Sequence, residues 1–430
     1  MMKTMKPMKT MPNTASQRAL IFPLLALATV LYFFANFQRT VIPGSIFSEL
    51  QSDLDISAAA VAGFGAAFMY FYAASQLFVG VLADRFGGFR LITVGGGLFC
   101  FASLIFPFSG NPAVLYLCRV LTGIGASTIY LSLVKEIQRA YPANFAPALG
   151  AAMLIGYLGS MTANAPFVAV IRLTGWRLGL IGAGTILAVV WGLFAAIRST
   201  VKLPAPGTTP FRLRAFVPAV DKRHNWVLYL LTGLSFAVFY VFLTVLGKKF
   251  LEDFCRMTPL AAGWVMTIAG ALAALSSFVM PVLSRLAGNR RRPFLRFMGT
   301  GTLVCTGGAL AALWFEWHSA WFFCGVLLLL ACCANMTPVF LALLAETNPP
   351  ENLGVCASFS NFLAYLMVAL LGHFSGMMMD LFEPEIVGGV RVYGTNSYLA
   401  VFGLCTAAAA IAFAASFLVK ESRGRRLEVR

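Results

Sequence analysis

The chain has 430 residues, of which 59% are hydrophobic and only 11% are charged, whereas about 25% of the residues of an average globular protein are charged. This composition excludes an ordinary soluble protein and predicts an all-α membrane protein, since long apolar runs cross a bilayer as helices. The formal net charge of +16 does not indicate nucleic-acid binding, because most of the basic residues lie in loops between apolar runs.

Twelve apolar runs follow one another in two groups of six. They cover residues 20–46, 57–83, 91–109, 112–138, 147–171 and 175–197, then 226–250, 259–286, 294–314, 319–345, 352–381 and 397–419. The stretch between the groups, 198–225, holds four prolines and six basic residues, so we predict a linker there. The predicted organisation is a tail (1–19), a six-helix bundle (20–197), the linker, a second bundle (226–419) and a tail (420–430).

Basic residues gather in alternate loops. Seven segments assigned to one face contain 24 of the 32 Lys and Arg but 7 of the 16 Asp and Glu; they are 1–19, 84–90, 135–146, 198–225, 285–296, 346–351 and 420–430. Cytoplasmic loops carry such an excess of Lys and Arg. We therefore expect a multi-pass protein of a bacterial inner membrane with both tails in the cytoplasm. Membrane lipids are expected partners, since basic clusters attract anionic head groups.

The first run contains a charged residue, Arg39, three positions after Asn36 and so on the same helix face. Charges inside spans are costly and usually functional, and a guanidinium in a cavity is able to bind a carboxylate or phosphate through two hydrogen bonds. The alternative is that Arg39 extends to the nearer interface, because Pro43 soon follows. The first interpretation makes Arg39 and Asn36 substrate-binding residues.

The second and third runs are joined by a short charged turn, residues 80–91, with the sequence GVLADRFGGFRL. Gly80 lets two helices approach closely, Asp84 is placed to face the positive N-terminal end of a helix, and Gly87 permits a sharp reversal. The turn resembles the signature loop of the Major Facilitator Superfamily, Gly-x-Leu-Ala-Asp-Arg-x-Gly-Arg-Arg/Lys. Gly88 and Phe89 stand where the family pattern has basic residues, and Arg90 follows one place later.

The resemblance covers nearly the whole chain. Arg119 opens a sequence in the fourth run, Arg-Val-Leu-Thr-Gly-Ile-Gly, that is similar to another pattern of the family. The resemblance implies two pseudo-symmetric six-helix bundles, alternating access, no cofactor and a monomer. It implies a role for Arg119 in proton coupling or cavity structure, and hydrogen bonds to backbone carbonyls are an equal alternative. It also implies a cytoplasmic gate made of Gly80, Asp84, Arg85, Gly87, Arg90 and Glu136.

The second group of runs repeats the first at one offset, as transporters with internal repeats do. Ser57 and Thr258 each open a span as an expected N-cap. The same offset places Arg39 opposite Tyr240, which adds Tyr240 to the predicted substrate site. At the end of the seventh run two lysines, 248 and 249, precede two acids, 252 and 253, so we predict local ion pairs there.

Three asparagines and a histidine inside the runs are further candidates. Asn164, Asn335 and Asn361 complete the predicted substrate site, because buried amides need partners. His373 is a coupling candidate beside Arg119, because histidine is the side chain that commonly exchanges protons at physiological pH, although a packed core histidine is the alternative. No Asp or Glu lies in mid-span, which leaves facilitated diffusion and anion exchange open beside proton symport. The nine cysteines show no metal-ligand spacing, so no metal site is predicted.

These features predict a secondary active or facilitative transporter of a small solute, with an organic anion or zwitterion favoured because of Arg39. Export of amphipathic compounds is the alternative, since the spans are apolar and rich in Met. An enzyme is not expected, because no catalytic motif and no phosphate-binding Walker loop occurs in the sequence.

Overall fold

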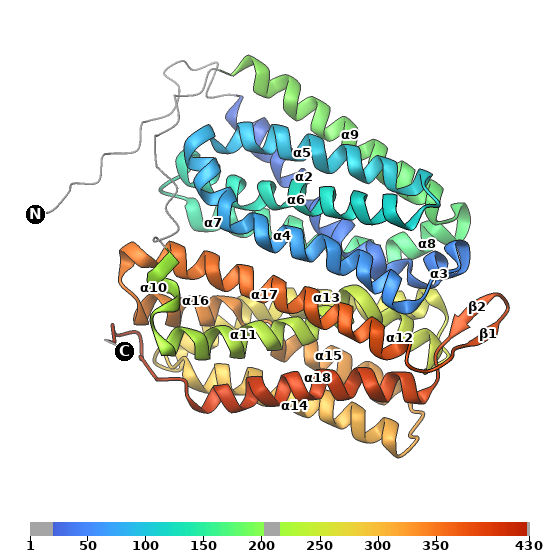
Figure 1. Cartoon of the computed structure of the whole chain (residues 1–430). Helices are drawn as coiled ribbons and strands as arrows, with labels where there is room; N and C mark the ends of the chain where they lie inside the picture. The colour runs from blue at the N-terminus through green and yellow to red at the C-terminus, as the bar shows by residue number, and fades with distance from the viewer. Residues whose placement is uncertain (1–19, 202–215, 428–430) are drawn as a thin grey trace, which may run out of the picture.

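The computed structural model describes residues 20–201 and 216–427, without the side chains of Asp84, Ala146, Pro350 and Glu351. The predicted N-terminal tail, 1–19, half of the predicted linker, 202–215, and the last residues of the predicted C-terminal tail, 428–430, lie outside the described residues. Figure 1 shows two groups of helices, one from each half of the chain, packed side by side.

The first half consists of helices that run back and forth between two ends. They are α2 (Ile21–Thr40), α3 (Phe47–Leu54), α4 (Ala58–Phe86), α5 (Gly88–Ile105), α6 (Pro112–Ala140), α7 (Phe145–Ala163), α8 (Ala165–Thr174) and α9 (Trp176–Thr200). A wide π-helical turn, η1 (Val41–Ser45), extends α2, and a tight 3-10 helical turn, η2 (Phe106–Phe108), extends α5.

The second half has the same plan with one addition. Its helices are α10 (Val217–Val220), α11 (Arg223–Val241), α12 (Gly247–Asp253), α13 (Pro259–Leu286), α14 (Arg292–Trp314), α15 (Ala320–Ala334), α16 (Thr337–Thr347), α17 (Pro350–Met379) and α18 (Thr395–Phe417), with η4 (Phe242–Leu246) between α11 and α12. The addition is an antiparallel hairpin, β1 (Glu385–Val387) and β2 (Val390–Val392), with Ile386 opposite Arg391.

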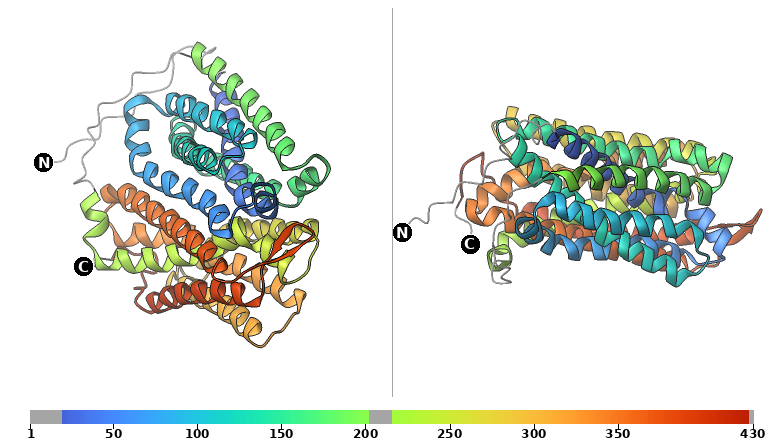
Figure 2. Two further views of the ribbon diagram at one scale, coloured as in Figure 1. Left: turned by 45° about the vertical axis from the view of Figure 1, so that its right-hand side comes forward. Right: turned by 90° about the horizontal axis from the view of Figure 1, so that it is seen from above.

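The start of α2 and the end of α18 lie at one end of the molecule, which we name the terminal end (Figures 1 and 2). The hairpin projects from the opposite end, which we name the hairpin end. In the described residues, eleven helices are long and apolar enough to cross a membrane, and the bent pair 147–163 and 165–174, with an angle of 42°, supplies a twelfth span. The predicted fold class, an all-α membrane protein with twelve spans, is confirmed.

The ends of several helices follow from local sequence. Ser57 and Thr258 cap α4 and α13, where their hydroxyls accept hydrogen bonds from the amides of Ala60 at 3.2 Å and Ala261 at 3.3 Å. The charged turn is tighter than predicted, because α4 continues to Phe86 and α5 begins at Gly88. Gly87 alone separates them, with a φ of 87° that favours glycine.

The predicted repeat is visible in the paired elements α2–η1–α3–α4 and α11–η4–α12–α13. The wide turns η1 and η4 occur at matching places and contact each other across the two halves. Gly44 makes this contact possible, since a Cβ on it would lie 2.6 Å from the carbonyl oxygen of Thr244. The repeated elements therefore meet near the middle of the molecule, where the candidate site lies.

Helices α5 and α6 pack so closely that one glycine between them has no room for a side chain. A Cβ on Gly125 would lie 2.5 Å from the carbonyl oxygen of Gly95 and 2.6 Å from the amide nitrogen of Phe99. We expect Gly125→Ala to force these backbones apart, at a cost of about 1–3 kcal/mol, and so to lower the melting temperature of the purified protein.

Gly182 on α9 is the matched control, because it is exposed and nothing lies within 4 Å of its Cβ position. Gly182→Ala should leave the melting temperature unchanged or raise it slightly, since Ala favours a helix by about 1 kcal/mol over Gly. Equal melting temperatures for the two variants would contradict the close packing of α5 on α6.

Candidate functional site

Arg39 lies at the centre of the molecule, where the two halves meet. It is carried by the last turn of α2, and its side chain is 8% exposed. One terminal nitrogen, Nη1, donates to the hydroxyl of Tyr365 on α17 at 3.0 Å. The other, Nη2, donates to the side-chain oxygen of Asn36 on its own helix. The site is therefore built from both halves of the chain.

Aromatic rings surround this guanidinium. Its central carbon lies 5.0 Å from the ring centre of Tyr240 and 5.6 Å from that of Tyr365, and such cation–π contacts contribute about 0.5–2 kcal/mol each. Tyr365 packs in turn on Tyr72 at 4.9 Å and on Phe236 at 5.7 Å between ring centres. The rings come from α4, α11 and α17, so they line the region between the halves.

The positive charge of Arg39 has no acidic partner among the described residues. Its neighbours are neutral hydroxyl, amide and aromatic groups, and its Nε is buried without a hydrogen-bond acceptor in the described part of the chain. Leaving a buried charge unpaired costs several kcal/mol, and aromatic contacts offset only part of that cost. The arrangement is therefore suited to an anion that supplies the missing negative charge.

The amide of Asn36 is fixed so that its oxygen faces Arg39. Its nitrogen donates to the carbonyl of Tyr32 at 2.9 Å, which leaves the side-chain oxygen as the acceptor for the guanidinium. The structure therefore brings together three of the six predicted substrate-binding residues, Arg39, Asn36 and Tyr240.

The other three predicted substrate-binding residues lie farther away. Asn361, one helical turn from Tyr365, donates to the side-chain oxygen of Gln76 on α4 at 3.1 Å. Asn164 and Asn335 occupy helix breaks, between α7 and α8 and between α15 and α16. Asn164 donates to the carbonyl of Ser160 at 3.0 Å, and Asn335 accepts from the hydroxyl of Thr337 at 3.2 Å. Both side chains therefore bond to residues close to them in sequence, at the breaks between helices.

Arg119 is fully buried in the first half, and within the described residues its side chain hydrogen-bonds only to backbone carbonyls. It donates to the carbonyls of Phe64 at 3.1 Å, Gln38 at 3.4 Å and Ile42 at 2.9 Å. Ile42 has extended backbone angles inside η1, so its carbonyl needs such a donor. This geometry ties α6 to α2, η1 and α4, and a coupling role for Arg119 stays a prediction.

His373 on α17 is partly buried. Its ring centre lies 6.1 Å from that of Phe374, and it makes no hydrogen bond within the described part of the chain. Its coupling role likewise stays a prediction.

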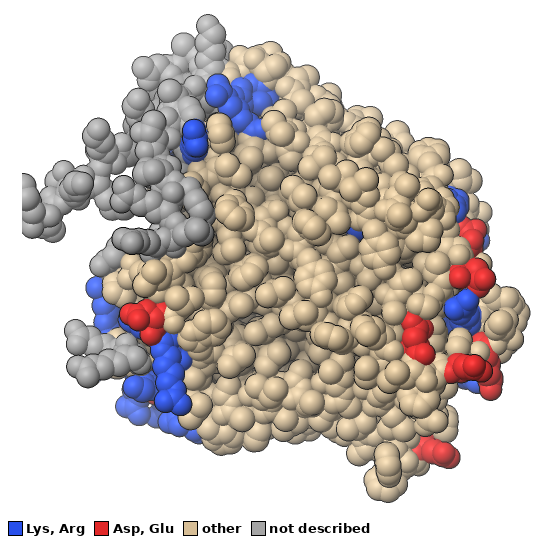
Figure 3. Space-filling model, viewed as in Figure 1, with Lys and Arg blue, Asp and Glu red and all other residues tan. Residues whose placement is uncertain are grey.

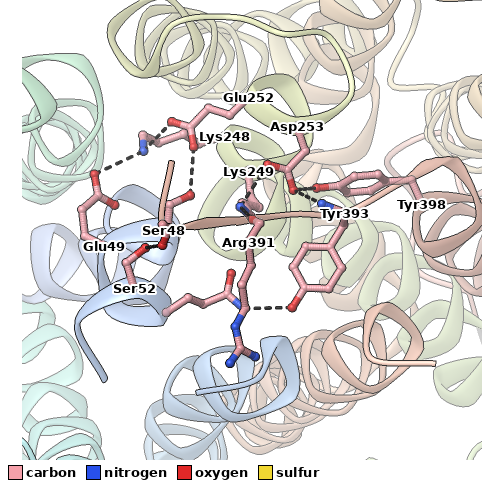
Figure 4. A network of polar contacts seen from close by, with 12 residues as sticks. Ser48, Glu49, Ser52, Lys248, Lys249, Glu252, Asp253, Arg391, Tyr393 and Tyr398 are labelled. Atoms are coloured by element: carbon pink, nitrogen blue, oxygen red, sulfur yellow. Dashed lines mark hydrogen bonds and ion pairs between the residues drawn. The ribbon is translucent and has the colours of Figure 1, made fainter. Parts of the chain in front are cut away.

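At the hairpin end, a polar network joins the two halves (Figure 4). Glu252 accepts from the hydroxyl of Ser48 at 3.2 Å, and the ammonium of Lys248 lies 3.9 Å from Glu49. The predicted local ion pairs are confirmed, because Lys248 pairs with Glu252 at 2.7 Å and Lys249 with Asp253 at 2.9 Å. Both lysines are almost completely buried.

The hairpin takes part in the same network. Arg391 of β2 donates to Asp55 at 2.6 Å, and the hydroxyl of Tyr393 accepts from the side-chain nitrogen of Gln51 at 2.9 Å. Burial raises the pKa of Tyr393 to about 12, so its hydroxyl remains protonated and is able to donate to Asp380 at 3.4 Å. The hairpin therefore covers the junction between the halves from one side.

Asp380, directly after α17, caps α4 from the other half of the molecule. Its two oxygens accept from the amides of Ala58 at 2.9 Å and Ala59 at 2.7 Å. A carboxylate at the N-terminal end of a helix is favourable because it satisfies free amides and faces the positive end of the helix dipole. This contact closes the hairpin end at the α4–α17 pair.

The terminal end differs. Within the described residues, the hydrogen bond between the halves that lies nearest this end is the one between Asn361 and Gln76. Glu136 bonds within the first half, accepting from the amide of Gly88 at 2.8 Å and from Arg139 at 3.0 Å. A Cβ at Gly88 would lie 2.5 Å from the carboxylate of Glu136, which explains a glycine at a position where the family pattern has a basic residue.

The other predicted gate residues do not join this contact in the described part of the chain. The side chain of Asp84 lies outside the described residues. Arg85 and Arg90 are exposed, and nothing lies within 4 Å of the Cβ position of Gly80. The carbonyl of Gly80 accepts from Lys135. The described hydrogen bonds therefore join the halves at the hairpin end, near Arg39, and between α8 and α13, where the amide of Ala165 donates to the hydroxyl of Thr267 at 3.1 Å.

This fold and its central site agree with a comparison to protein families. A model of the Major Facilitator Superfamily matches residues 28–372. The chain belongs to this superfamily. Its members are membrane transporters, not enzymes, and the predicted family is confirmed.

Curated relatives match over shorter stretches. The chain is 23% identical over 266 residues to the riboflavin transporter RibZ of Clostridioides difficile, and 25% identical over 175 residues to the probable sulfoacetate transporter SauU of Cupriavidus necator. It is 31% identical over 129 residues to an uncharacterised transporter of the superfamily from Mycobacterium tuberculosis. These matches cover 57%, 40% and 30% of this chain and 57%, 40% and 22% of the relatives, less than two thirds of their length.

Solved structures of the superfamily have the same fold. A bacterial homologue of the human lysosomal transporter Spinster, crystallised in an inward-facing, unoccupied conformation, has a TM-score of 0.74 at 19% identity and covers 94% of this chain and 98% of its own. The nucleoside transporter NupG has a TM-score of 0.72 at 13% identity, with 93% and 99% covered.

Sequence reasoning missed Tyr365, which accepts a hydrogen bond from Arg39, and Gln76, which accepts one from Asn361. The signal for Tyr365 was its position four residues after Asn361, on the same face of the eleventh span. It also missed the contacts of Asp55, Asp380 and Arg391 across the hairpin end, because these residues meet only when the two halves pack.

The cap that Asp380 forms on α4 generates a prediction about conformation. Asp380→Ala removes two charge-assisted bonds that exist only while the hairpin end is closed, so the closed state should lose about 1–3 kcal/mol. Spin labels on the α3–α4 turn and on the hairpin report the separation of the halves. We expect electron paramagnetic resonance to show a larger fraction of long label-to-label distances in the variant than in the original protein.

Asp53→Ala is the matched control. Asp53 also accepts charge-assisted bonds at this end, from Arg177 at 2.7 and 3.0 Å, but both residues belong to the first half. Its removal should leave the label distances as in the original protein. If both variants behaved alike, the Asp380 contact would not hold the halves together.

Proposed function

We propose that this protein carries a small organic anion across the membrane by alternating access, with Arg39 as the residue that binds the anionic group. The supporting observation is the buried guanidinium that lacks an acidic partner among the described residues. A carboxylate, sulfonate or phosphate of the solute would accept two hydrogen bonds from it. Sulfoacetate, the solute in the name of one relative, belongs to this chemical class.

The aromatic rings favour a solute with an apolar or planar part beside its anionic group. Tyr240, Tyr365 and Phe236 present rings next to Arg39, and rings contribute both apolar contact and hydroxyl partners. Since both halves of one chain complete the site, we propose that a monomer is the working unit. Asn361 and Gln76 lie on the terminal side of the rings and would contact the solute on its way.

We propose that the terminal end faces the cytoplasm. Lys and Arg gather at this end, whereas most of the acidic side chains on the face in Figure 3 lie at the hairpin end, which is the distribution expected for a cytoplasmic end. With this orientation the described conformation is closed toward the outside of a bacterial inner membrane. The solute would then reach Arg39 from the cytoplasmic side in this state.

Arg39→Gln tests the binding role of Arg39. Loss of one member of a buried charge pair costs about 3–5 kcal/mol, so we expect binding of the transported anion to weaken about 100-fold or more. Counterflow in liposomes against a set of carboxylates, sulfonates and phosphates identifies the anion, and calorimetry measures its affinity.

Two further variants sharpen this test. Arg39→Lys keeps the charge but not the two-pronged geometry, so it should retain part of the affinity. Arg172→Gln removes an exposed arginine elsewhere and should bind as the original protein does. Unchanged affinity in Arg39→Gln would show that Arg39 does not bind the anion.

We further propose that one anion is exchanged for another, without a proton. The described neighbours of Arg39 include no carboxylate, and proton-coupled carriers usually need a titratable group deep in the bundle. Anion loaded inside liposomes should therefore accelerate uptake several-fold, whereas an imposed pH gradient should not. His373→Gln should leave the rate and its pH dependence unchanged; uptake driven by the pH gradient alone would refute exchange.

A further inference from the structure

A pocket of about 490 Å³ opens at the terminal end of the second half, far from Arg39. Its wall is formed by the turn before α14, the first turns of α14 and the segment that follows α18. The residues that line it are Arg290, Arg292, Pro293, Arg296, Glu421 and Arg423. Four arginines and a single acidic residue thus line one space.

The carboxylate of Glu421 is occupied by backbone amides. One oxygen of Glu421 accepts from the amides of Arg291 at 2.9 Å and Arg423 at 3.2 Å, and the other accepts from the amide of Arg292 at 3.0 Å. Glu421 therefore caps the N-terminal end of α14 and makes no ion pair with a lining arginine within the described residues. The excess positive charge of the pocket remains uncompensated by these side chains.

Two of the arginines are held in place but incompletely bonded. Arg292 donates to the carbonyl of Phe417 at 3.3 Å, and the guanidinium of Arg296 lies 5.1 Å from the ring centre of Phe417. The Nε groups of both arginines are buried without an acceptor in the described part of the chain. A buried donor without an acceptor costs about 1–3 kcal/mol, so these groups favour an incoming anion.

The surroundings place the pocket at the level of lipid head groups. Large apolar side chains beside it are exposed, with Leu286 78%, Phe417 51% and Leu418 60% accessible, as expected for a surface that faces lipid tails. Basic side chains just beyond an apolar belt attract anionic head groups, with about 1 kcal/mol for each Lys or Arg. The position of the pocket beside the apolar belt therefore favours the phosphate of a lipid over a freely dissolved ion.

We infer that this pocket is a binding site for a phosphate group, separate from the central anion site. Planar guanidinium groups bind phosphate oxygens through paired hydrogen bonds, and four of them supply more donors than one phosphate accepts. The phosphate is carried either by an anionic lipid or by a soluble compound, and the two sources differ in their need for acyl chains.

The test uses the purified full-length protein in a neutral detergent. It is titrated with phosphatidylglycerol, with phosphatidylcholine as a zwitterionic comparison and with inorganic phosphate, and binding is followed by the melting temperature and by native mass spectrometry. We expect phosphatidylglycerol to bind and stabilise the protein more than phosphatidylcholine does. Binding of inorganic phosphate with the same dependence on the pocket arginines would assign the site to soluble phosphates.

Three double variants locate the effect. Arg292→Gln/Arg296→Gln removes the two arginines that contact Phe417, and Arg290→Gln/Arg423→Gln removes two exposed ones whose loss does not endanger folding. Each should weaken binding about tenfold or more. Arg425→Gln/Arg426→Gln removes the same charge from exposed residues of the same segment outside the pocket and should bind as the original protein does.

Equal weakening in all three variants would show a diffuse attraction to basic residues and would overturn the site. So would equal binding of the two lipids together with no binding of inorganic phosphate. Solute counterflow, and its dependence on Arg39, is measured in a separate experiment. A failure of this inference is therefore distinguishable from a failure of the proposed transport function.

Discussion

The buried charge of Arg39 lies between the two halves, and the proposed function depends on how that charge is compensated. A guanidinium that bonds to a tyrosine hydroxyl and an asparagine oxygen, without a carboxylate among the described residues, is less stable than a paired one. A protein that only needed to hold its halves together would gain by placing an acid at this point, as it does with Lys248 and Glu252 at the hairpin end. The two buried cations therefore differ: Lys248 is neutralised within the chain, and we propose that Arg39 is neutralised by the solute.

The position of Arg39 follows from the repeated architecture. Matching wide turns, η1 and η4, extend α2 and α11, and they contact each other because Gly44 leaves room for the backbone at Thr244. This contact places the last turns of the two repeated helices side by side, so that Arg39 faces its counterpart Tyr240 at 5.0 Å. Arg119 stabilises the same region, because it donates a hydrogen bond to the carbonyl of Ile42, whose backbone angles are not helical. Backbone geometry thus fixes the position of the side chains that we propose bind the solute.

The sequence predicted the spans well, because twenty-residue apolar runs and N-caps such as Ser57 are local signals. It also predicted the meeting of Arg39 and Tyr240, because an internal repeat converts sequence offset into spatial symmetry. Contacts between the halves were beyond it: Asp380 on the N-terminal end of α4 and Gln51 on Tyr393 depend on how two bundles dock. The β-hairpin is a local pairing that the sequence reasoning missed. Asn164 and Asn335 show the same limit, since their polarity did not reveal that they lie at helix breaks; their part in substrate binding stays a prediction.

The bonds at the hairpin end also bear on how an anion would control the motion of the halves. Most of them are partly exposed pairs such as Asp55–Arg391, whose net contributions are about 0.2–1 kcal/mol each because water replaces them on opening. Their sum is a few kcal/mol, which is the size of gap that a ligand is able to reverse. Arg39 belongs to the first half, whereas Tyr240 and Tyr365 belong to the second. An anion held between them would therefore change the strength of the contact between Arg39 and these tyrosines. Binding of the anion would then be coupled to the opening of the halves through the guanidinium that we propose as the binding group.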